Sequence, residues 1–145
     1  MRPQKYFSCQ LIAAINARIV LGMPDVSNAQ FETLVDLVKC RYGAAIHIEK
    51  AYPKLNLKVI KGPIRLDWIK SHLPVALPIW DRSYGYHSIL LYDFNQHTSS
   101  FKTHNAVRIK QAGVFHWQEL KALATKHGKR PCKAFTLKNP IIQSL

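Results

Sequence analysis

Four residues of this chain have side chains that together could carry out thiol chemistry. Cys9 stands at the start of an apolar stretch that we expect to be helical, and Gln4 precedes it by five residues. His87 and Asn105 come later, on segments that we expect to form neighbouring strands. A nucleophile, an oxyanion donor, an acid–base group and a side chain that orients the imidazole are the parts of a cysteine acyl-transfer site.

Each residue type has a chemical role in such a site. The positive end of a helix dipole beside Cys9 lowers the pKa of a thiol and favours the thiolate, which is the attacking species. A histidine pairs with the thiolate and later protonates the leaving group, while a side-chain amide holds the ring in place. An amide donor close to the sulfur, such as Gln4, stabilises the transition state by roughly 3–4 kcal/mol.

Five segments share a pattern with a known family. They are residues 4–15 around the Ser-Cys pair, 72–80, 85–93 around His87, 101–105 and 117–120. In this order they resemble the papain-like cysteine peptidases, and within them the bacterial double-glycine leader peptidases and their stand-alone relatives. The resemblance implies a papain-like fold with Cys9 as nucleophile, His87 as general acid and base, and Asn105 as orienter. It also implies an oxyanion hole made by Gln4 and the Cys9 backbone N–H, and no metal or organic cofactor.

The chain departs from the family pattern at two positions. Gln10 follows the nucleophile, where the family usually has glycine, and Asn105 stands where the leader peptidases commonly have aspartate. We also expect none of the membrane and ATPase domains that accompany the leader peptidases of exporters. The resemblance therefore does not carry leader processing with it, and the substrate stays open.

Other residues compete for two of these roles. His104 is the alternative to His87 as the functional histidine, and Asp93 or Asn95 could replace Asn105 as the orienting residue. Cys40 and Cys132 lie far from Cys9 and form no CxxC pair, which argues against a disulfide framework and a zinc site. We expect both to be structural, and Trp68, Trp80 and Trp117 to belong to the core or to a cleft wall.

The pattern of apolar and turn residues predicts the elements that would position this site. We expect a helix from Cys9 that stops at Gly22, and a second helix that begins with a capping box at Ser27 and ends near Gly43. The remaining expectations are a strand at 57–61, a helix at 64–71, an edge or bulged strand at 75–80 containing Pro78, strands at 86–94 and 99–107, a helix at 117–126 and a strand at 132–137.

The two strands at 86–94 and 99–107 would form a hairpin that assembles the site. Closing the turn at 95–98 places residue 87 opposite residue 105 or 106, so His87 and Asn105 become neighbours. Helices first and a largely antiparallel sheet second define an α+β fold, with N-terminal helices packed on the sheet. We expect one papain-like domain over residues 1–145.

Composition agrees with a single domain that has a real core. The chain has 145 residues, of which 48% are hydrophobic, and no stretch reaches the roughly 20 apolar residues of a membrane span. The first apolar run is broken by Asn16 and Arg18 and has no cleavage pattern, so we expect no signal peptide and a cytoplasmic location. Small basic chains are frequent in phage and mobile elements, which is an association only.

Charge is the other strong feature of the sequence. Lys and Arg number 21 against 8 Asp and Glu, a formal net charge of +13, which favours acidic proteins, nucleic acid or anionic membranes as partners. A patch is expected at Lys126, Lys129, Arg130, Lys133 and Lys138, and the chain has no nucleic-acid-binding motif.

Three functions are consistent with these features. The first is a cysteine peptidase that cleaves a peptide or isopeptide bond of a polypeptide, which could be acidic. The second uses the same triad for acyl transfer or glutamine deamidation. The third is a non-catalytic basic protein that binds nucleic acid or an acidic protein. Neither an oligomeric state nor a cleavage specificity follows from the sequence.

Overall fold

A computed structural model of the chain describes residues 1–2, 9–41, 44–45, 47–81, 85–104, 113–126 and 130–140. The elements in these ranges are α1 (Cys9–Val20), α2 (Asn28–Val38), β1 (Cys40–Arg41), β2 (Ala44–Ala45), η1 (Ile48–Lys50), α3 (Ala51–Lys54), β3 (Leu57–Gly62), α4 (Leu66–Ser71), β4 (Val75–Asp81), β5 (Gly85–Asn95), β6 (Ser100–His104), β7 (Gly113–His116), α5 (Trp117–Thr125) and β8 (Cys132–Leu137).

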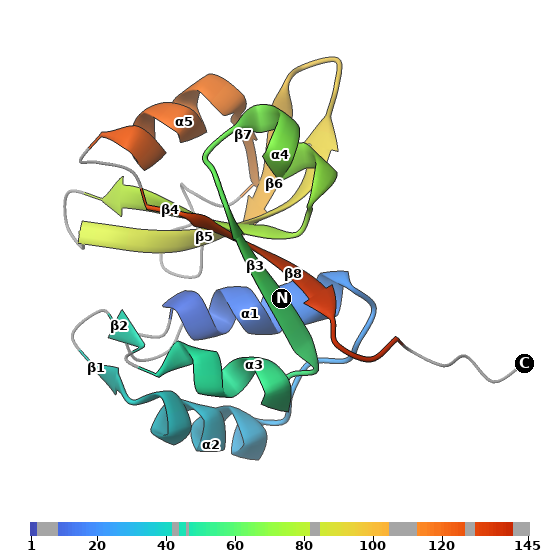
Figure 1. Ribbon diagram of the computed structural model, residues 1–145, viewed down its shortest axis with the longest axis vertical. Coiled ribbons are helices and arrows are strands. Elements are labelled where there is room, and N and C mark those ends of the chain that lie inside the picture. Colours follow the sequence, from blue (N-terminus) through green and yellow to red (C-terminus); the bar gives the residue numbers. More distant parts are fainter. Residues whose placement is uncertain are drawn as a thin grey trace, which may run out of the picture.

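Six of the strands form one antiparallel sheet. Their order is β3-β8-β4-β5-β6-β7, and β1 and β2 form a separate two-stranded ribbon. Helices α1, α2 and α3 gather at one end of the molecule, α4 and α5 lie at the other, and β3 and β8 run between the two ends (Figure 1). The expected α+β architecture, with N-terminal helices on a largely antiparallel sheet, is therefore confirmed.

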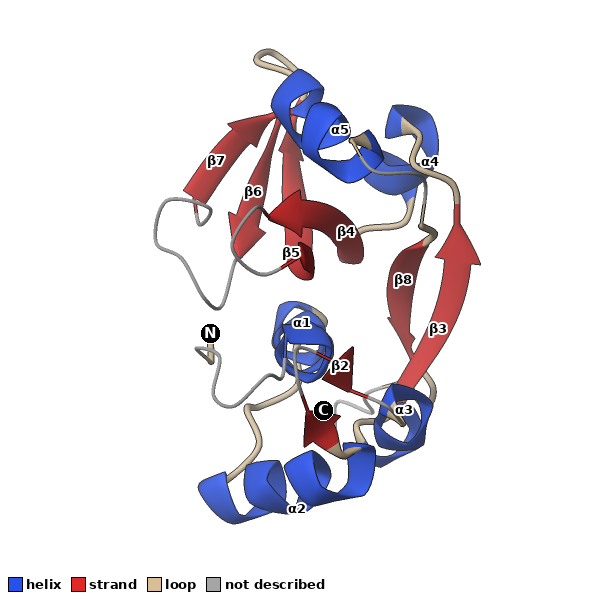
Figure 2. Cartoon of the chain, turned by 90° about the vertical axis from the view of Figure 1, so that its left-hand side faces the viewer, coloured by secondary structure: helices blue, strands red, loops and turns tan. Residues whose placement is uncertain are grey.

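Helices cover both faces of the sheet because strands β4 and β5 are apolar on both faces. Ala76 and Leu90 belong to the cluster that α1 and α2 complete, while Leu77 and Ile89 belong to the cluster around α5. Successive residues of a strand point to opposite faces, so this alternation assigns one row of side chains to each helix. In Figure 2, α1 and α5 accordingly lie on opposite sides of β4 and β5.

Helix α1, which begins at Cys9, is the most deeply buried helix. Its Leu11, Ile12 and Ile15 are almost wholly buried, and burial of each such side chain contributes about 1.5–3 kcal/mol. Gly22 follows with a φ of 96°, a left-handed conformation that ends the helix where the sequence predicted. The predicted cap at Ser8 lies outside the described residues.

Helix α2 begins as predicted and ends earlier than predicted. Ser27 Oγ accepts from the backbone N–H of Gln30 at 3.1 Å, and Gln30 Oε1 accepts from the backbone N–H of Ser27 at 2.9 Å, which completes the capping box. The helix ends at Val38 because Lys39 adopts a left-handed conformation with a φ of 50°, so the expectation of an end near Gly43 is wrong.

Strand β4 combines an interior and an edge position. It pairs with β8 only at Val75 and Ala76, whereas it pairs with β5 along its whole length. Pro78 therefore falls where β4 has one described neighbour, which suits a residue without a backbone N–H and agrees with the edge interpretation. The sequence analysis missed β1, β2, η1, α3 and β7, all of them short.

Candidate functional site

Cys9 and His87 line one cavity. Cys9 is the first residue of α1 and is buried, and His87 is buried on β5. The cavity has a volume of about 240 Å³. Its described lining comprises Cys9, Gln10, Lys61, Ala76, Pro78, His87, Ser88, Arg130, Pro131 and Lys133. The nucleophile and the histidine predicted from the sequence are thus brought to the same place, 78 residues apart in the chain.

Two opposing effects act on the Cys9 thiol. Burial raises the pKa of Cys9, and backbone hydrogen bonds from Ser88, Gln10 and Cys9 itself act to lower it. Burial is the larger effect, so the pKa is raised overall. The helix N-terminus alone therefore does not make Cys9 a thiolate at neutral pH, and a thiolate here requires a positive partner such as an imidazolium.

The hydrogen bond from Ser88 locates the sulfur relative to His87. Ser88 follows His87 directly, and adjacent Cα atoms lie about 3.8 Å apart, so the sulfur rests against the backbone beside the histidine. His87 pairs with Ile79 across β4 and β5, and Ile79 belongs to the face of the sheet that α5 covers. Ser88 and Leu90 belong to the opposite face, which α1 covers. Residues of both faces line the cavity. An ion pair between Cys9 and His87 therefore requires the imidazole to turn toward the sulfur.

Gln4 and Asn105, the other two residues of the predicted site, lie outside the described residues.

The register of the hairpin is described as far as His104, which pairs with Leu90. The predicted register placed residue 102 or 103 opposite Leu90, so that prediction is wrong. Its cause is the turn, which lies at 96–99 and not at 95–98 and so shifts the pairing by two residues, while the bulge between Leu91 and Asp93 moves it back by one.

His104 has a structural environment. Its Nδ1 lies 3.2 Å from Nδ2 of Asn16, a fully buried residue of α1. Oδ1 of Asn16 accepts from the backbone N–H of Arg2 at 2.8 Å, and Nδ2 also donates to the Arg2 carbonyl at 3.1 Å. Nδ2 must therefore donate to His104, whose ring accepts in its neutral form. The alternative that His104 is the functional histidine receives no support, since it lines no cavity with Cys9.

Asp93 and Asn95 are too far from His87 to orient it. They follow it by six and eight residues on an extended strand that rises about 3.3 Å per residue. Asn95 Oδ1 accepts from the backbone N–H groups of His97 and Thr98, and Asp93 forms a 3.6 Å ion pair with Lys102. Both side chains stabilise the hairpin, so neither alternative to Asn105 holds.

The buried cysteine of β8 and two of the three tryptophans, Trp68 and Trp117, have structural environments. Cys132 is fully buried, and burial raises its pKa to about 12, so its thiol is inert at neutral pH. Trp117 is buried in the cluster around α5, and Trp68 stacks on His72 with ring centroids 4.2 Å apart. Both observations agree with the prediction of core or wall positions.

The sequence did not predict that Lys133 belongs to the site. Lys133 Nζ donates to Gln10 Oε1 at 3.2 Å and to Tyr52 Oη at 3.0 Å, and lines the cavity with Lys61 and Arg130. The sequence analysis treated Gln10 only as a departure from a family pattern, and Lys133 only as part of a surface patch. Gln10 and Lys133 are 123 residues apart, so no local pattern could have joined them.

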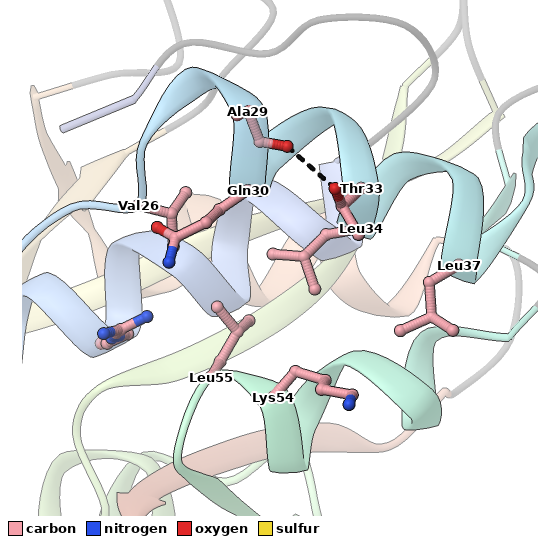
Figure 3. Close-up of a pocket in the computed structure, with 9 residues that line it drawn as sticks. Val26, Ala29, Gln30, Thr33, Leu34, Leu37, Lys54 and Leu55 are labelled. Atoms are coloured by element: carbon pink, nitrogen blue, oxygen red, sulfur yellow. Dashed lines mark hydrogen bonds between the residues drawn. The ribbon is translucent and has the colours of Figure 1, made fainter.

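A larger hollow lies elsewhere, among α1, α2 and α3. Its volume is about 530 Å³, and Val26, Leu34, Leu37 and Leu55 supply most of its apolar wall (Figure 3). In the same view Thr33 turns back to hydrogen-bond the Ala29 carbonyl at 3.0 Å. The described residues of its lining include no thiol, histidine or carboxylate, so the cavity at Cys9 is the better candidate for chemistry.

Comparison with protein-family models and with curated proteins finds no match for this chain. In the part of the chain that the structure describes, no three His, Cys, Asp or Glu side chains are grouped so that they could hold a metal ion. No helix among the described residues is long and apolar enough to cross a membrane.

Proposed function

We propose that this protein is a papain-like cysteine peptidase or a related thiol hydrolase, in which Cys9 attacks a peptide or isopeptide carbonyl. The observation that carries the proposal is the joint placement of Cys9 and His87 on one cavity, with the sulfur held against the backbone of the residue after His87. The resemblance of segments 4–15 and 85–93 to the leader peptidase branch supports the same assignment.

The proposed reaction begins with transfer of the Cys9 proton to His87. The thiolate then bonds to the carbonyl carbon, and the developing oxyanion accepts a hydrogen bond from the Cys9 backbone N–H. His87 protonates the leaving nitrogen as the C–N bond breaks, which leaves a thioester. Water, deprotonated by His87, attacks the thioester, releases the carboxylic acid and returns the thiol. By resemblance, Gln4 assists the oxyanion and Asn105 orients the imidazole.

Burial of Cys9 makes His87 indispensable in this scheme. Because burial raises the pKa of the thiol, the thiolate at neutral pH needs a cationic partner, and the scheme assigns that role to the imidazolium of His87, which also takes up the thiol proton. The loss of His87 should therefore remove the reactivity of Cys9 and not merely reduce turnover.

The test is the pH dependence of Cys9 alkylation by iodoacetamide, followed by mass spectrometry. We expect labelling below about pH 7, and a fall of at least about tenfold in His87→Ala. His104→Gln is the matched control, because it removes another histidine of the same sheet that is not among the described lining of the cavity, and glutamine keeps an acceptor for Asn16. Cys132 serves as the internal reference for an inert thiol.

Labelling only above about pH 8.5, unchanged in His87→Ala, would contradict the proposal. A second measurement addresses the reaction itself. An unbiased peptide library incubated with the wild-type chain should be cleaved, and Cys9→Ala should abolish the cleavage without changing the unfolding midpoint by more than a small core truncation does.

A further inference from the structure

The wall of the cavity beside Cys9 is cationic. Lys61 comes from β3, Lys133 from β8, and Arg130 from the segment just before β8. The described lining contains no carboxylate. Three positive groups on a concave site whose described lining holds no acidic residue form an anion-binding arrangement, and a concave wall strengthens their combined potential.

Lys133 is the best placed of these groups. Its side chain is partly buried, and its described hydrogen-bond partners, Gln10 Oε1 and Tyr52 Oη, are both neutral. An ammonium has three donors, so one donor has no hydrogen-bond partner among the residues that the structure describes. Burial lowers the pKa of Lys133, Lys61 lowers it further, and only Glu49 acts in the opposite direction. Among the described residues Lys133 forms no ion pair that would neutralise it.

The position of Lys133 relative to the nucleophile follows from Gln10. Gln10 is the residue after Cys9, and its side chain holds the ammonium at 3.2 Å. An anion that accepts the third donor of Lys133 would therefore lie in the cavity that Cys9 and Gln10 line. Gln10 stands where the papain-like family usually has glycine, and glycine has no side chain that could bind Lys133.

We propose that the Cys9 cavity selects substrates that carry a carboxylate next to the attacked carbonyl, with Lys133 as the direct partner and Lys61 and Arg130 as supporting charges. The proposal rests on the proposed function in so far as Cys9 is the reacting group. The carboxylate can belong to an acidic side chain or to a free C-terminus, which share the same chemistry.

The experiment compares two alkylating reagents of nearly the same size at Cys9. Iodoacetate carries a carboxylate and iodoacetamide does not, so the ratio of their rates reports the preference for an anion. The same ratio for Cys9 in the urea-unfolded chain is the reference. We expect the native ratio to exceed the reference by about tenfold at low salt, as for one charge-assisted hydrogen bond, and to fall as salt is added.

Substitutions assign the preference to particular residues. Lys133→Gln should return the ratio most of the way to the reference, and Lys61→Gln and Arg130→Gln should lower it less. Lys58→Gln is the matched control, since Lys58 is an exposed lysine of the same strand as Lys61 that does not line the cavity. The smaller part of the preference that survives Lys133→Gln is shared by Lys61, Arg130 and the imidazolium of His87. A ratio equal to the reference, or one that Lys133→Gln leaves unchanged, would overturn the proposal.

Two isomeric ligands separate the sources of the carboxylate. N-acetylglutamic acid α-amide has its carboxylate on the side chain, and N-acetylglutamine has it at the C-terminus. Either should slow iodoacetamide labelling of Cys9 more than the neutral N-acetylglutamine amide does, and the better protector identifies the source. Equal protection by all three compounds would contradict an anion site.

The outcome also separates this inference from the proposed function. Slow iodoacetamide labelling with a preference for iodoacetate that depends on Lys133 would leave an anion site beside an unactivated thiol, so only the peptidase proposal would fail. Fast iodoacetamide labelling that depends on His87, without a preference for iodoacetate, would preserve the nucleophile and remove the anion site.

Discussion

Asn16 of α1 donates its side-chain amide to Nδ1 of His104 on β6, with 3.2 Å between the two nitrogens. The same amide bonds both backbone groups of Arg2. One fully buried polar side chain therefore ties the helix that begins with Cys9 to the hairpin that begins near His87, and also fixes Arg2. Such a network is stable only when every member is satisfied.

Replacement of Asn16 by alanine should destabilise the fold by about 1–3 kcal/mol, because it leaves the partly buried partners of its amide without these hydrogen bonds. The measurement is the free energy of unfolding in urea. Asn28→Ala is the control, since Asn28 is exposed and bonds Arg2 only at 3.4 Å, and we expect a loss of at most about 0.5 kcal/mol. Equal losses in the two variants would show that the network is not cooperative.

The pKa of His104 is lowered by burial and, to a smaller extent, by the positive N-terminus. The unfolded chain therefore takes up a proton near pH 6.5, while the folded chain resists protonation until a lower pH. The stability that this residue contributes is complete above about pH 6.5 and is lost as the pH falls through the lowered pKa of the folded state.

In His104→Gln the free energy of unfolding should vary less between pH 7 and pH 5 than in the wild type. Glutamine keeps an acceptor for Asn16 and does not titrate, so the comparison isolates the charge. Urea unfolding at each pH gives the slope, and a steeper dependence in the variant would contradict the assigned direction of the shift.

The sequence predicted those parts of the fold that depend on local signals. The capping box at Ser27 and the left-handed glycine at Gly22 act within one helical turn, so the beginning of α2 and the end of α1 were placed correctly. The end of α2 was misplaced because Lys39, a residue with a side chain, adopts the left-handed conformation that the sequence analysis expected only of a glycine.

The candidate site was predicted in part for a comparable reason. Cys9 at a helix start and His87 on a strand are each recognisable from their neighbours, and the structure brings both to one cavity. The contact of Gln10 with Lys133 joins the two ends of the chain and depends on β8 lying between β3 and β4, a property of the sheet order. The hairpin register was missed because the turn lies one residue later than predicted, and the bulge after Leu91, which no residue type there indicates, reverses only part of that shift.

Gln10→Ala should weaken the anion preference of Cys9 without removing the nucleophile. The variant deletes one of the two neutral acceptors that hold the Lys133 ammonium, and leaves Tyr52 in place. We expect the ratio of iodoacetate to iodoacetamide rates to fall by about threefold, roughly half the effect of Lys133→Gln in free energy. The iodoacetamide rate alone should change little, and its collapse would mean that Gln10 acts on the sulfur directly.

We expect the buried thiol of Cys132 to make the fold less stable in alkaline solution. Burial raises its pKa from 9.0 to about 12, so between these values the unfolded chain has lost a proton that the folded chain still holds. Its contribution to stability is complete below pH 9 and decreases as the pH rises toward 12. Tyr52, whose pKa burial also raises, acts in the same direction.

Guanidinium unfolding of Cys132→Ala between pH 8 and pH 10.5 should therefore show a shallower decline than the wild type. The truncation itself lowers the free energy of unfolding by about 1 kcal/mol at every pH, and this constant offset does not affect the slope. Parallel curves for the two proteins would contradict the buried thiol as a source of alkaline sensitivity.

Gly62, the last residue of β3, is held to glycine by a side chain rather than by its backbone. A Cβ at this position would overlap the indole ring of Trp68, which itself stacks on His72 at an interplanar angle of 15°. The ring cannot withdraw without losing that stacking, so Gly62→Ala should destabilise the fold by about 1–3 kcal/mol. Urea unfolding of Gly62→Ala, Trp68→Leu and the double variant measures the coupling. The alanine should cost markedly less when residue 68 is leucine, because the smaller side chain vacates the space, and a cost that is the same in both backgrounds would place the constraint in the strand and not in the ring.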